Sequence, residues 1–413
     1  MLLWVLFYSV CIVFFLEREL DMTNQHEQHI EKLVIAGGPC AGKSTGIPMI
    51  KKALKALGWM VLVSREVPTS LVEEHDYVLH GEGKNISLPE FQALVLAQVI
   101  KQEDELMERA RESKEPKVVI LCDRGRYDGL GYMDHESFYQ MTQKTFNHGR
   151  DELFSSYAGC VFLTSPAVDR PDVYMKCMSG NPARRETDPR EAALQNQKSL
   201  DACVGVSRMV IIDNSGDFEE KMAKAVAAVC YFLGNKEYEK KWSTGEALSK
   251  EEVAELFEIN AVHTLPASVS QAYLLLSEED QEDGVVVRRV RAMTLDDSAK
   301  NSKHFLALKR EKQGGGGLES EDLISELEYE QSIRDYLDPT CSIIEKTRFY
   351  FIYDGRYFEL DVFEKPANQA FILELEYFPG EDLSKVRLPH FLGELTDVTL
   401  DLMYANNVIA RKK

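Results

Sequence analysis

The chain has 413 residues, of which 44% are hydrophobic, and a formal net charge of −20 at pH 7. This length exceeds what one hydrophobic core usually organises, so we expect two domains. A strongly acidic protein repels polyanions, which excludes broad nucleic-acid binding through phosphate neutralisation. Any anion site must therefore be a local basic pocket.

The first sixteen residues, MLLWVLFYSVCIVFFL, are continuously apolar. They are fewer than the roughly 20 residues that span a bilayer, and they lack the basic region of an export signal. A membrane anchor within residues 1–21, an extension ahead of a start at Met22 and a cleaved signal remain open. The eight cysteines have no metal-binding spacing and indicate free thiols. We therefore expect a cytoplasmic protein, with membrane association through this segment or through lipid head groups left open.

Residues 31–235 alternate short apolar segments with helical patterns. The apolar segments KLVIAGG, WMVLVSREV, PKVVILCDRG, AGCVFLTSP and RMVIIDNSG are typical of strands buried on both faces. Helices between such strands indicate crossovers that keep neighbouring strands parallel. The sequence therefore predicts an α/β domain with a parallel sheet and helices on both faces.

The pattern changes after residue 235. Residues 236–252 are charged and poor in apolar side chains, and we expect them to be a linker. Residues 253–413 contain strand-like segments with turns at EDG and YDGR, interrupted by the helical run ESEDLISELEYEQSIRDYL. This pattern predicts an α+β domain with an antiparallel sheet.

The strongest functional signal is GGPCAGKST, residues 37–45. It satisfies G-x-x-x-x-G-K-[ST] between a predicted strand and a predicted helix. In such a loop the backbone N–H groups wrap nucleotide phosphates, Lys43 neutralises phosphate charge and the Ser44 hydroxyl ligates Mg²⁺. We expect ATP or GTP with Mg²⁺ as cofactors. The predicted contacts are Gly37, Gly38, Pro39, Cys40, Ala41, Gly42, Lys43, Ser44 and Thr45.

Two carboxylates follow strands at the sheet edge where the phosphates would lie. Asp123 ends VVILCD and is predicted to hold Mg²⁺ or its water, with a helix-capping role as the alternative. Glu66 ends LVSRE and is predicted to act as the base for an acceptor hydroxyl, with a surface ion pair to Arg65 as the alternative.

Residues 170–202 form a long arginine-bearing segment that Pro182 and Pro189 interrupt. This composition is expected of a mobile lid whose arginines close on the transferring phosphate. Arg184 and Arg185 are the candidates, and ordinary surface arginines are the alternative.

The motifs GGPCAGKST, REVPT, LCDRG, ARRET and IIDNSGDFEEKM together resemble the AAA-type P-loop domain of NadR nicotinamide-riboside kinases and of the TRPL-translocation-defect family. The resemblance covers residues 31–234. It implies a compact, kinase-like nucleotide domain. No arginine-finger pattern is visible, so we do not expect a hexameric unfoldase.

Charges recur at alternate positions in the second domain, and a strand places alternate side chains on one face. Buried charges are costly unless they meet one another, a metal or a polyphosphate, whereas on an exposed face they form cross-strand ion pairs. The pairs with this spacing are Arg289 with Arg291, Lys346 with Arg348, Glu359 with Asp361, Glu374 with Glu376 and, if extended, Glu328 with Glu330.

The order of these segments resembles the CYTH domain of triphosphate tunnel metalloenzymes over residues 255–413. The resemblance implies a tunnel with phosphate ligands Arg289, Arg291, Lys309, Lys346 and Arg348, and with an acidic, metal-binding side made by Glu328, Glu330, Asp361, Glu374 and Glu376. Such enzymes open with E-x-E-x-K, which AELFEINAVHTLP does not contain. We therefore expect ligand binding rather than efficient hydrolysis.

In this order the two resemblances match the TRPL-translocation-defect family, which implies phosphoinositide recognition. We expect a Mg²⁺-dependent ATP- or GTP-binding protein with kinase-like or slow NTPase activity, whose second domain binds a polyphosphate or a phosphoinositide head group. The first alternative is a kinase acting on a nucleoside or metabolite, with Glu66 or Asp123 as base. The second is a tunnel triphosphatase. The nucleobase, the acceptor and the oligomeric state stay open.

Overall fold

The computed structural model describes residues 28–79, 83–178, 187–234, 238–295, 302–311, 317–378 and 381–412. The chain divides into two compact units, residues 1–234 and 235–413, and each is described by itself. Within the described ranges, no helix has both the length and the hydropathy that a membrane crossing requires. The apolar segment 1–21 lies outside them.

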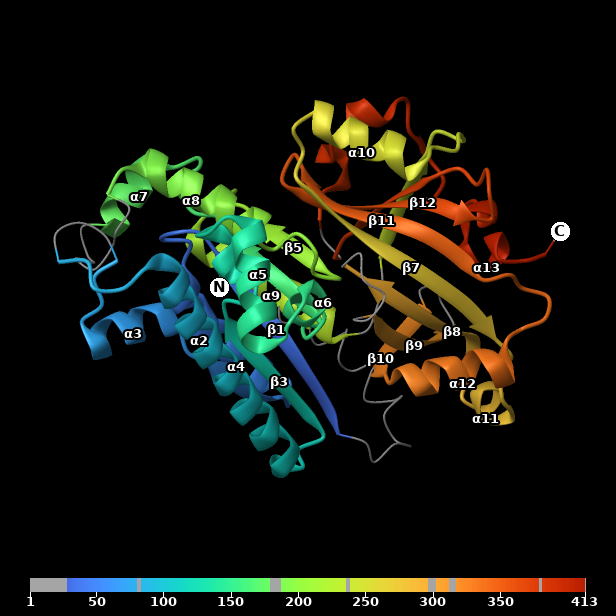
Figure 1. Ribbon diagram of the computed structural model, residues 1–413, viewed down its shortest axis with the longest axis horizontal. Coiled ribbons are helices and arrows are strands. Elements are labelled where there is room, and N and C mark those ends of the chain that lie inside the picture. The colour runs from blue at the N-terminus through green and yellow to red at the C-terminus, as the bar shows by residue number, and fades with distance from the viewer. Residues whose placement is uncertain are drawn as a thin grey trace. The chain divides into compact units, whose positions relative to one another are not determined.

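The first unit contains a five-stranded parallel sheet in the order β2-β3-β1-β4-β5. Figure 1 labels β1, β3 and β5 of this sheet. Its apolar strand segments are almost fully buried, as the sequence pattern predicts for a sheet covered by helices. The strands are β1 (His29–Gly37), β2 (Met60–Ser64), β3 (Lys117–Asp123), β4 (Gly159–Leu163) and β5 (Met209–Ile212). The predicted parallel α/β architecture is confirmed.

The helices of this unit begin in two different ways. Ser87 and Asp217 cap α4 and α9 through their side chains, whereas Gly42 begins α2 without a side-chain cap. The first N–H groups of α2 are therefore left for another acceptor. The helices are α2 (Lys43–Ala56), α3 (Val67–His75), α4 (Leu88–Ser113), α5 (His135–Phe146), α6 (Arg150–Phe154), α7 (Pro171–Met178), α8 (Pro189–Asp201), α9 (Phe218–Leu233) and the 3-10 turn η1 (Asp128–Gly131).

A buried ionic network joins the sheet to α4. Glu103 of α4 accepts hydrogen bonds from Lys32 of β1 at 2.7 Å, from Arg126 at 2.8 Å and from the Tyr157 hydroxyl at 2.6 Å. Glu103 and Lys32 are both buried, so each charge depends on the other for its solvation.

The second unit contains a nine-stranded sheet in the order β10-β9-β8-β7-β11-β12-β13-β6-β14, and its paired strands are antiparallel. The predicted antiparallel architecture is confirmed. The predicted YDGR turn joins β11 to β12, with Asp354 and Gly355 at positive φ. The strands are β6 (Glu239–Ser243), β7 (Thr264–Leu274), β8 (Val285–Thr294), β9 (Lys303–Glu311), β10 (Gly317–Ile324), β11 (Ile344–Tyr353), β12 (Arg356–Lys365), β13 (Ile372–Glu376) and β14 (Thr396–Asp397).

Helices cover the apolar faces of this sheet and determine where its charges lie. Phe257 of α10 (Lys250–Ile259) packs against Phe351 and Phe358 of β11 and β12. Ile333 of α12 (Glu326–Tyr336) packs over β7, β8 and β9. Because side chains alternate, Arg289, Arg291, Lys346 and Arg348 occupy the opposite face. The shorter helical segments are α11 (Glu278–Glu282), α13 (Asn406–Ile409), η3 (Leu383–Lys385), η4 (His390–Leu392) and η5 (Leu402–Tyr404).

Two predictions for this unit differ from the structure. The segment predicted as a linker, residues 236–252, contains β6, whose Ser243 is buried and whose Trp242 packs in the core. Glu328 and Glu330 lie on α12, not on a strand, and both are exposed. The helix begins there because Ser325 and Glu328 form a capping box, which the local sequence S-x-x-E favours over a continued strand.

We expect Glu103→Ala to lower the free energy of unfolding by about 3 kcal/mol, because it leaves Lys32 buried without its partner. Urea unfolding measures this change. The control is Glu105→Ala on the same helix, whose partner Lys101 lies 3.9 Å away at the surface and which should cost less than about 0.5 kcal/mol. Equal effects of the two substitutions would refute the structural role of the network.

Candidate functional site

The loop between β1 and α2 has the backbone shape that phosphate binding requires. Cys40 and Gly42 adopt left-handed conformations, with φ of 58° and 97°. A Cβ atom on Gly42 would lie 2.6 Å from Phe218, so glycine is required there for conformation and for space. The uncapped N–H groups of α2 follow directly, which is the arrangement that binds anions at a helix N-terminus.

Lys43 is a buried cation at this loop. Its Nζ donates a 2.9 Å hydrogen bond to the carbonyl oxygen of Gly37. Burial lowers the pKa of Lys43 to about 8, and the neighbouring Arg124 charge acts in the same direction, while nearby carboxylates oppose it. A phosphate group beside Lys43 would stabilise its charged form.

Asp123 has a carboxylate oxygen that lacks a partner. Its strand pairs with β1 so that Asp123 lies opposite Ile35, two residues before Gly37. Its Oδ1 atom is buried and has no hydrogen-bond partner in the described parts of the chain. Burial raises the pKa of Asp123, although the Lys43 charge opposes this shift. An orphaned carboxylate oxygen at this edge fits a Mg²⁺ ion shared with the Ser44 hydroxyl.

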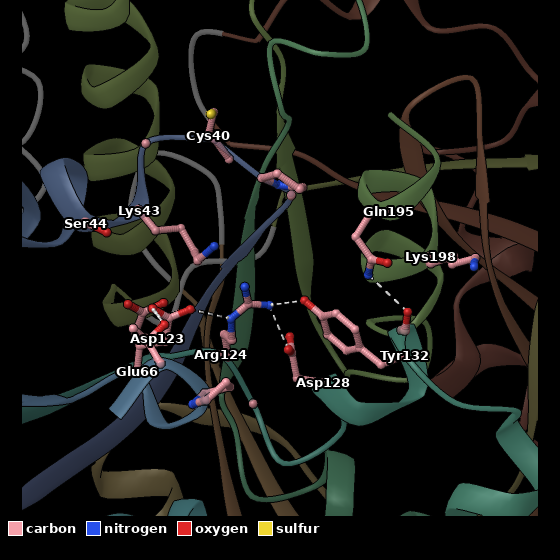
Figure 2. A pocket seen from close by; sticks show the side chains of 18 of the residues that line it. Cys40, Lys43, Ser44, Glu66, Asp123, Arg124, Asp128, Tyr132, Gln195 and Lys198 are labelled. Carbon is pink, nitrogen blue, oxygen red and sulfur yellow. Dashed lines mark hydrogen bonds and ion pairs between the residues drawn. The ribbon is translucent and has the colours of Figure 1, made fainter. Parts of the chain in front are cut away.

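Arg124 connects the two strand ends that carry Asp123 and Glu66. It has a positive φ of 81°, which is uncommon outside glycine. Its guanidinium contacts Asp128 Oδ2 at 2.8 Å, Glu66 Oε1 at 3.4 Å and the Tyr132 hydroxyl at 3.3 Å (Figure 2). Glu66 therefore pairs with Arg124 rather than with its neighbour Arg65, which was the alternative that the sequence left open.

These residues line one cavity of about 1240 Å³. Its lining includes the loop residues Gly38 to Thr45 and Glu66, Asp123 and Arg124. A second part of the lining is mostly apolar, and we call this part of the cavity the apolar chamber. Its wall residues come from α3, α4, α5 and neighbouring loops: Val67, Pro68, Val72, Leu79, Leu88, Phe91, Gln92, Val95, Leu96, Val99 and Phe138.

Residues of the segments after β4 and β5 also line the cavity. Arg170 donates a 2.8 Å hydrogen bond to the carbonyl oxygen of Gly216. Lys221 donates to the Thr164 carbonyl at 2.5 Å and to Asn214 Oδ1 at 2.8 Å, and burial lowers its pKa to about 8. These segments add cations and amide groups to the cavity lining.

The structure brings together most of the residues predicted for the nucleotide site. Gly38 to Thr45, Glu66 and Asp123 all line the cavity, and Gly37 lies at its edge as the acceptor for Lys43. The proposed lid arginines Arg184 and Arg185 lie outside the described residues. The sequence did not single out Gln92, Asp128, Tyr132, Arg170, Lys198 and Lys221, which also line the cavity. Only Asp128 carries a local signal, because it follows DRG by three residues.

In the second unit, the predicted cations are paired with carboxylates. Arg348 contacts Asp361 at 2.6 Å, Glu374 at 3.0 Å and also Glu359. Lys346 pairs with Asp361, and Lys241 of β6 pairs with Glu374 at 2.5 Å. Despite burial, Arg348 and Lys346 hold the pKa of Asp361 below its usual range. We call these residues and Glu239 the ionic cluster.

The other predicted tunnel residues are also engaged. Arg289 and Lys309 contact Glu319, and Arg291 contacts Glu321 at 2.7 Å. Lys309 is the most open of these cations, with 47% of its side chain exposed. Glu328 and Glu330 do not join the acidic side, because α12 carries them outside. Within the described ranges, no group of three or more acidic, histidine or cysteine side chains has the geometry of a metal site.

Strand β7, which lies between β8 and β11, has no charged side chain. On β7, Ala267 lies opposite Arg348, Val269 opposite Lys346 and Gln271 opposite Arg291. These neutral residues occupy alternate positions on one face of β7.

We expect Asp123→Asn to remove the Mg²⁺ dependence of nucleotide binding, because the amide cannot replace an ionised ligand of the metal. Calorimetric titration with ATP and GTP should show tighter binding with Mg²⁺ for the parent chain and no such gain for the variant. Asp213→Asn is the matched control, since Asp213 also follows a strand but bonds Ser215 and lies outside the cavity lining. Loss of the Mg²⁺ effect in both variants would contradict this assignment.

The ionic cluster predicts a pH dependence of stability. Burial raises the pKa of Glu359 from 4.5 to about 8, although Arg348 opposes the shift. Between these two values the folded chain keeps a proton that the unfolded chain has lost. The stabilisation that this proton provides is complete below about pH 4.5 and is lost as the pH rises through about 8. Urea unfolding between about pH 5 and pH 8 should show falling stability, with a smaller slope in Glu359→Gln. Glu364→Gln, exposed on the same strand, should keep the parent slope, and an unchanged slope in Glu359→Gln would contradict the assignment.

Comparison with known proteins agrees with the first unit's site. Residues 32–221 match the family model described as an AAA domain. No curated protein matches the chain. The N-terminal part of the chain therefore contains an AAA-type P-loop domain.

Three solved structures show similarity at low TM-scores. The inorganic triphosphatase NE1496 is 23% identical, with 43% of this chain and 95% of that chain covered and a TM-score of 0.28. A second structure, described as the hypothetical protein NE1496, is also 23% identical, with 42% and 97% covered and a TM-score of 0.27. The PH1012 protein from Pyrococcus horikoshii OT3 is 19% identical, with 34% and 77% covered and a TM-score of 0.23. We assign the architecture of the second unit from its own strand pairing.

Proposed function

We propose that the first unit is a Mg²⁺-dependent phosphotransferase that transfers the γ-phosphoryl group of ATP or GTP to a hydroxyl group of a small acceptor. The observation that carries this proposal is that one cavity is lined by the phosphate loop, by Glu66, Asp123 and Arg124, and by the residues of the apolar chamber. A nucleotide hydrolase needs room only for water beside the γ-phosphate. A chamber with apolar walls is suited to a second organic molecule.

The size of the cavity supports two ligands. Its 1240 Å³ exceeds the roughly 300–1,000 Å³ that is typical of a site for one small molecule. A nucleotide bound with its phosphates at Lys43 would leave the apolar chamber for the acceptor. Both reactants would then be held in one water-poor space, which favours transfer over hydrolysis.

The reaction assigns a role to each charged group. The acceptor oxygen forms a bond to the γ-phosphorus, the bond to the β,γ-bridging oxygen breaks, and the nucleoside diphosphate leaves. Lys43 and Arg124 neutralise charge on the phosphoryl oxygens. The hydroxyl proton passes to Glu66, which is 36% exposed and lies beside Arg124. Mg²⁺, held by Ser44 and Asp123, would neutralise charge on the β- and γ-phosphates.

The ligands predicted for the second unit have less support. Its described cations already contact carboxylates, so a polyphosphate or phosphoinositide head group would have to displace those partners. The absence of carboxylates on β7 also weakens the case for a tunnel triphosphatase. A nucleotide-binding protein with slow hydrolysis remains the rival to the phosphotransferase.

The direct experiment incubates the full chain with γ-labelled ATP or GTP, Mg²⁺ and a panel of nucleosides and other small alcohols. We expect label to appear in one class of acceptor, in amounts equal to the nucleoside diphosphate formed. Lys43→Ala should abolish this transfer. Release of inorganic phosphate alone, at a rate that no acceptor changes, would support the rival.

Glu66→Gln tests the assigned base. We expect the rate constant for transfer to fall about 100-fold or more, with nucleotide affinity changed less than about threefold, because the amide cannot accept the proton. Glu74→Gln on the same helix is the control, since Glu74 is exposed and lies outside the cavity lining. Full activity of Glu66→Gln would move the role of the base to Asp123.

A further inference from the structure

Arg124 lines the cavity from a strained point of the backbone. Its φ of 81° is unusual for a residue other than glycine, and such a conformation persists only where the surrounding structure holds it. Asp128 begins the 3-10 turn η1, and Tyr132 follows the end of that turn. The turn is tightly packed, because a Cβ atom on Gly129 would lie 2.3 Å from the ring of Phe138. The backbone that carries Asp128 and Tyr132 is therefore held in place beside Arg124.

The guanidinium of Arg124 has different partners at two of its nitrogen atoms. Nη1 donates to Asp128 Oδ2 at 2.8 Å and to the Tyr132 hydroxyl at 3.3 Å. Nε donates to Glu66 Oε1 at the longer distance of 3.4 Å. Figure 2 shows Glu66 on one side of Arg124, and Asp128 and Tyr132 on the other. The third nitrogen, Nη2, takes part in none of these contacts.

Asp128 is the partner that fixes the orientation of this guanidinium. The side chains of Arg124 and Asp128 are 15% and 14% exposed, whereas that of Glu66 is 36% exposed. A short ion pair with little access to solvent is stronger than a longer, more exposed one. Because the guanidinium is planar and rigid, holding Nη1 against Asp128 also sets the direction of Nη2.

We propose that Asp128, assisted by Tyr132, is a positioning residue that holds Nη2 of Arg124 against an oxygen of the transferring phosphoryl group. This inference rests on the proposed phosphotransferase function. Because Nη2 and Nε share one edge of the guanidinium, the phosphoryl group then lies beside Glu66. An acceptor hydroxyl that gives its proton to Glu66 is thereby held next to the phosphorus atom that it attacks. Asp128 acts through Arg124 and not on the reactants themselves.

Substitutions of Asp128 and Tyr132 in the full chain test this inference. Asp128→Asn should lower kcat for transfer about tenfold or more, because a misaligned guanidinium no longer fits the transferring group. The KM for the nucleotide and its affinity with Mg²⁺ should change less than about threefold, which also shows that the variant is folded. Asp128→Glu retains a carboxylate and should recover part of the loss. Tyr132→Phe should lower kcat only about threefold, since the closer partner Asp128 remains.

A double substitution distinguishes positioning from a separate catalytic or structural role. Arg124→Lys removes the planar group that Asp128 would orient, so in that background Asp128→Asn should lower kcat further by less than about twofold. Asp104→Asn is the matched control and should keep the parent kcat. Asp104 also pairs with an arginine, Arg126 at 3.3 Å, but it is 67% exposed and lies outside the cavity lining. Full activity of Asp128→Asn, or an undiminished effect of that substitution in the Arg124→Lys chain, would overturn the inference.

The outcomes also separate this inference from the proposed function. If the parent chain hydrolyses the nucleotide without transfer to any acceptor, the phosphotransferase is rejected. The same variants then test Asp128 through the rate of hydrolysis, because Arg124 would meet the phosphoryl group in either reaction. Transfer at the same kcat in the parent chain and in Asp128→Asn would sustain the phosphotransferase and overturn the role of Asp128. A parent chain that performs neither reaction would overturn both.

Discussion

The uncompensated charge at the end of β3 is the constraint on which the first unit's site depends. Asp123 has a buried oxygen without a partner, and burial disfavours the charged forms of both Asp123 and Lys43. A folded protein can retain such groups when a ligand completes their interactions. The parallel register of β1 and β3 brings them to one edge, and the uncapped start of α2 adds further donors. In the proposed function, a nucleotide with Mg²⁺ would supply the complementary charges.

The P-loop cavity and the ionic cluster treat buried charge in opposite ways. In the second unit, Arg348, Lys346 and Asp361 satisfy one another on the inner face of the sheet, while α10 and α12 cover its apolar face. Such a network is neutral enough to persist without a ligand. In the first unit, Arg124 bridges Glu66 and Asp128, but Asp123 stays incomplete. This contrast is why we place the proposed chemistry in the P-loop cavity.

The sequence predicted the parts of the site whose chemistry is contiguous along the chain. The loop from Gly37 to Thr45 and the strand ends at Glu66 and Asp123 follow from local patterns. Tyr132 was not predicted, because it follows Arg124 by eight residues, and only the fold shows its hydroxyl beside that guanidinium. Glu328 and Glu330 were assigned by alternation, but the capping box at Ser325 begins a helix there. The antiparallel architecture of the second unit was predictable, whereas its strand order and the pairing of its charges depend on register.

The central claim is that one cavity holds a phosphate donor and an acceptor together. The most direct measurement compares the affinity of ATP with that of dinucleoside polyphosphates, in which adenosine is joined through four to six phosphates to a second nucleoside. If the phosphate loop and the apolar chamber are occupied at once, the best of these compounds should bind about 100-fold or more tighter than ATP, because its second nucleoside binds intramolecularly. Equal affinities for ATP and for every linked compound would contradict the account.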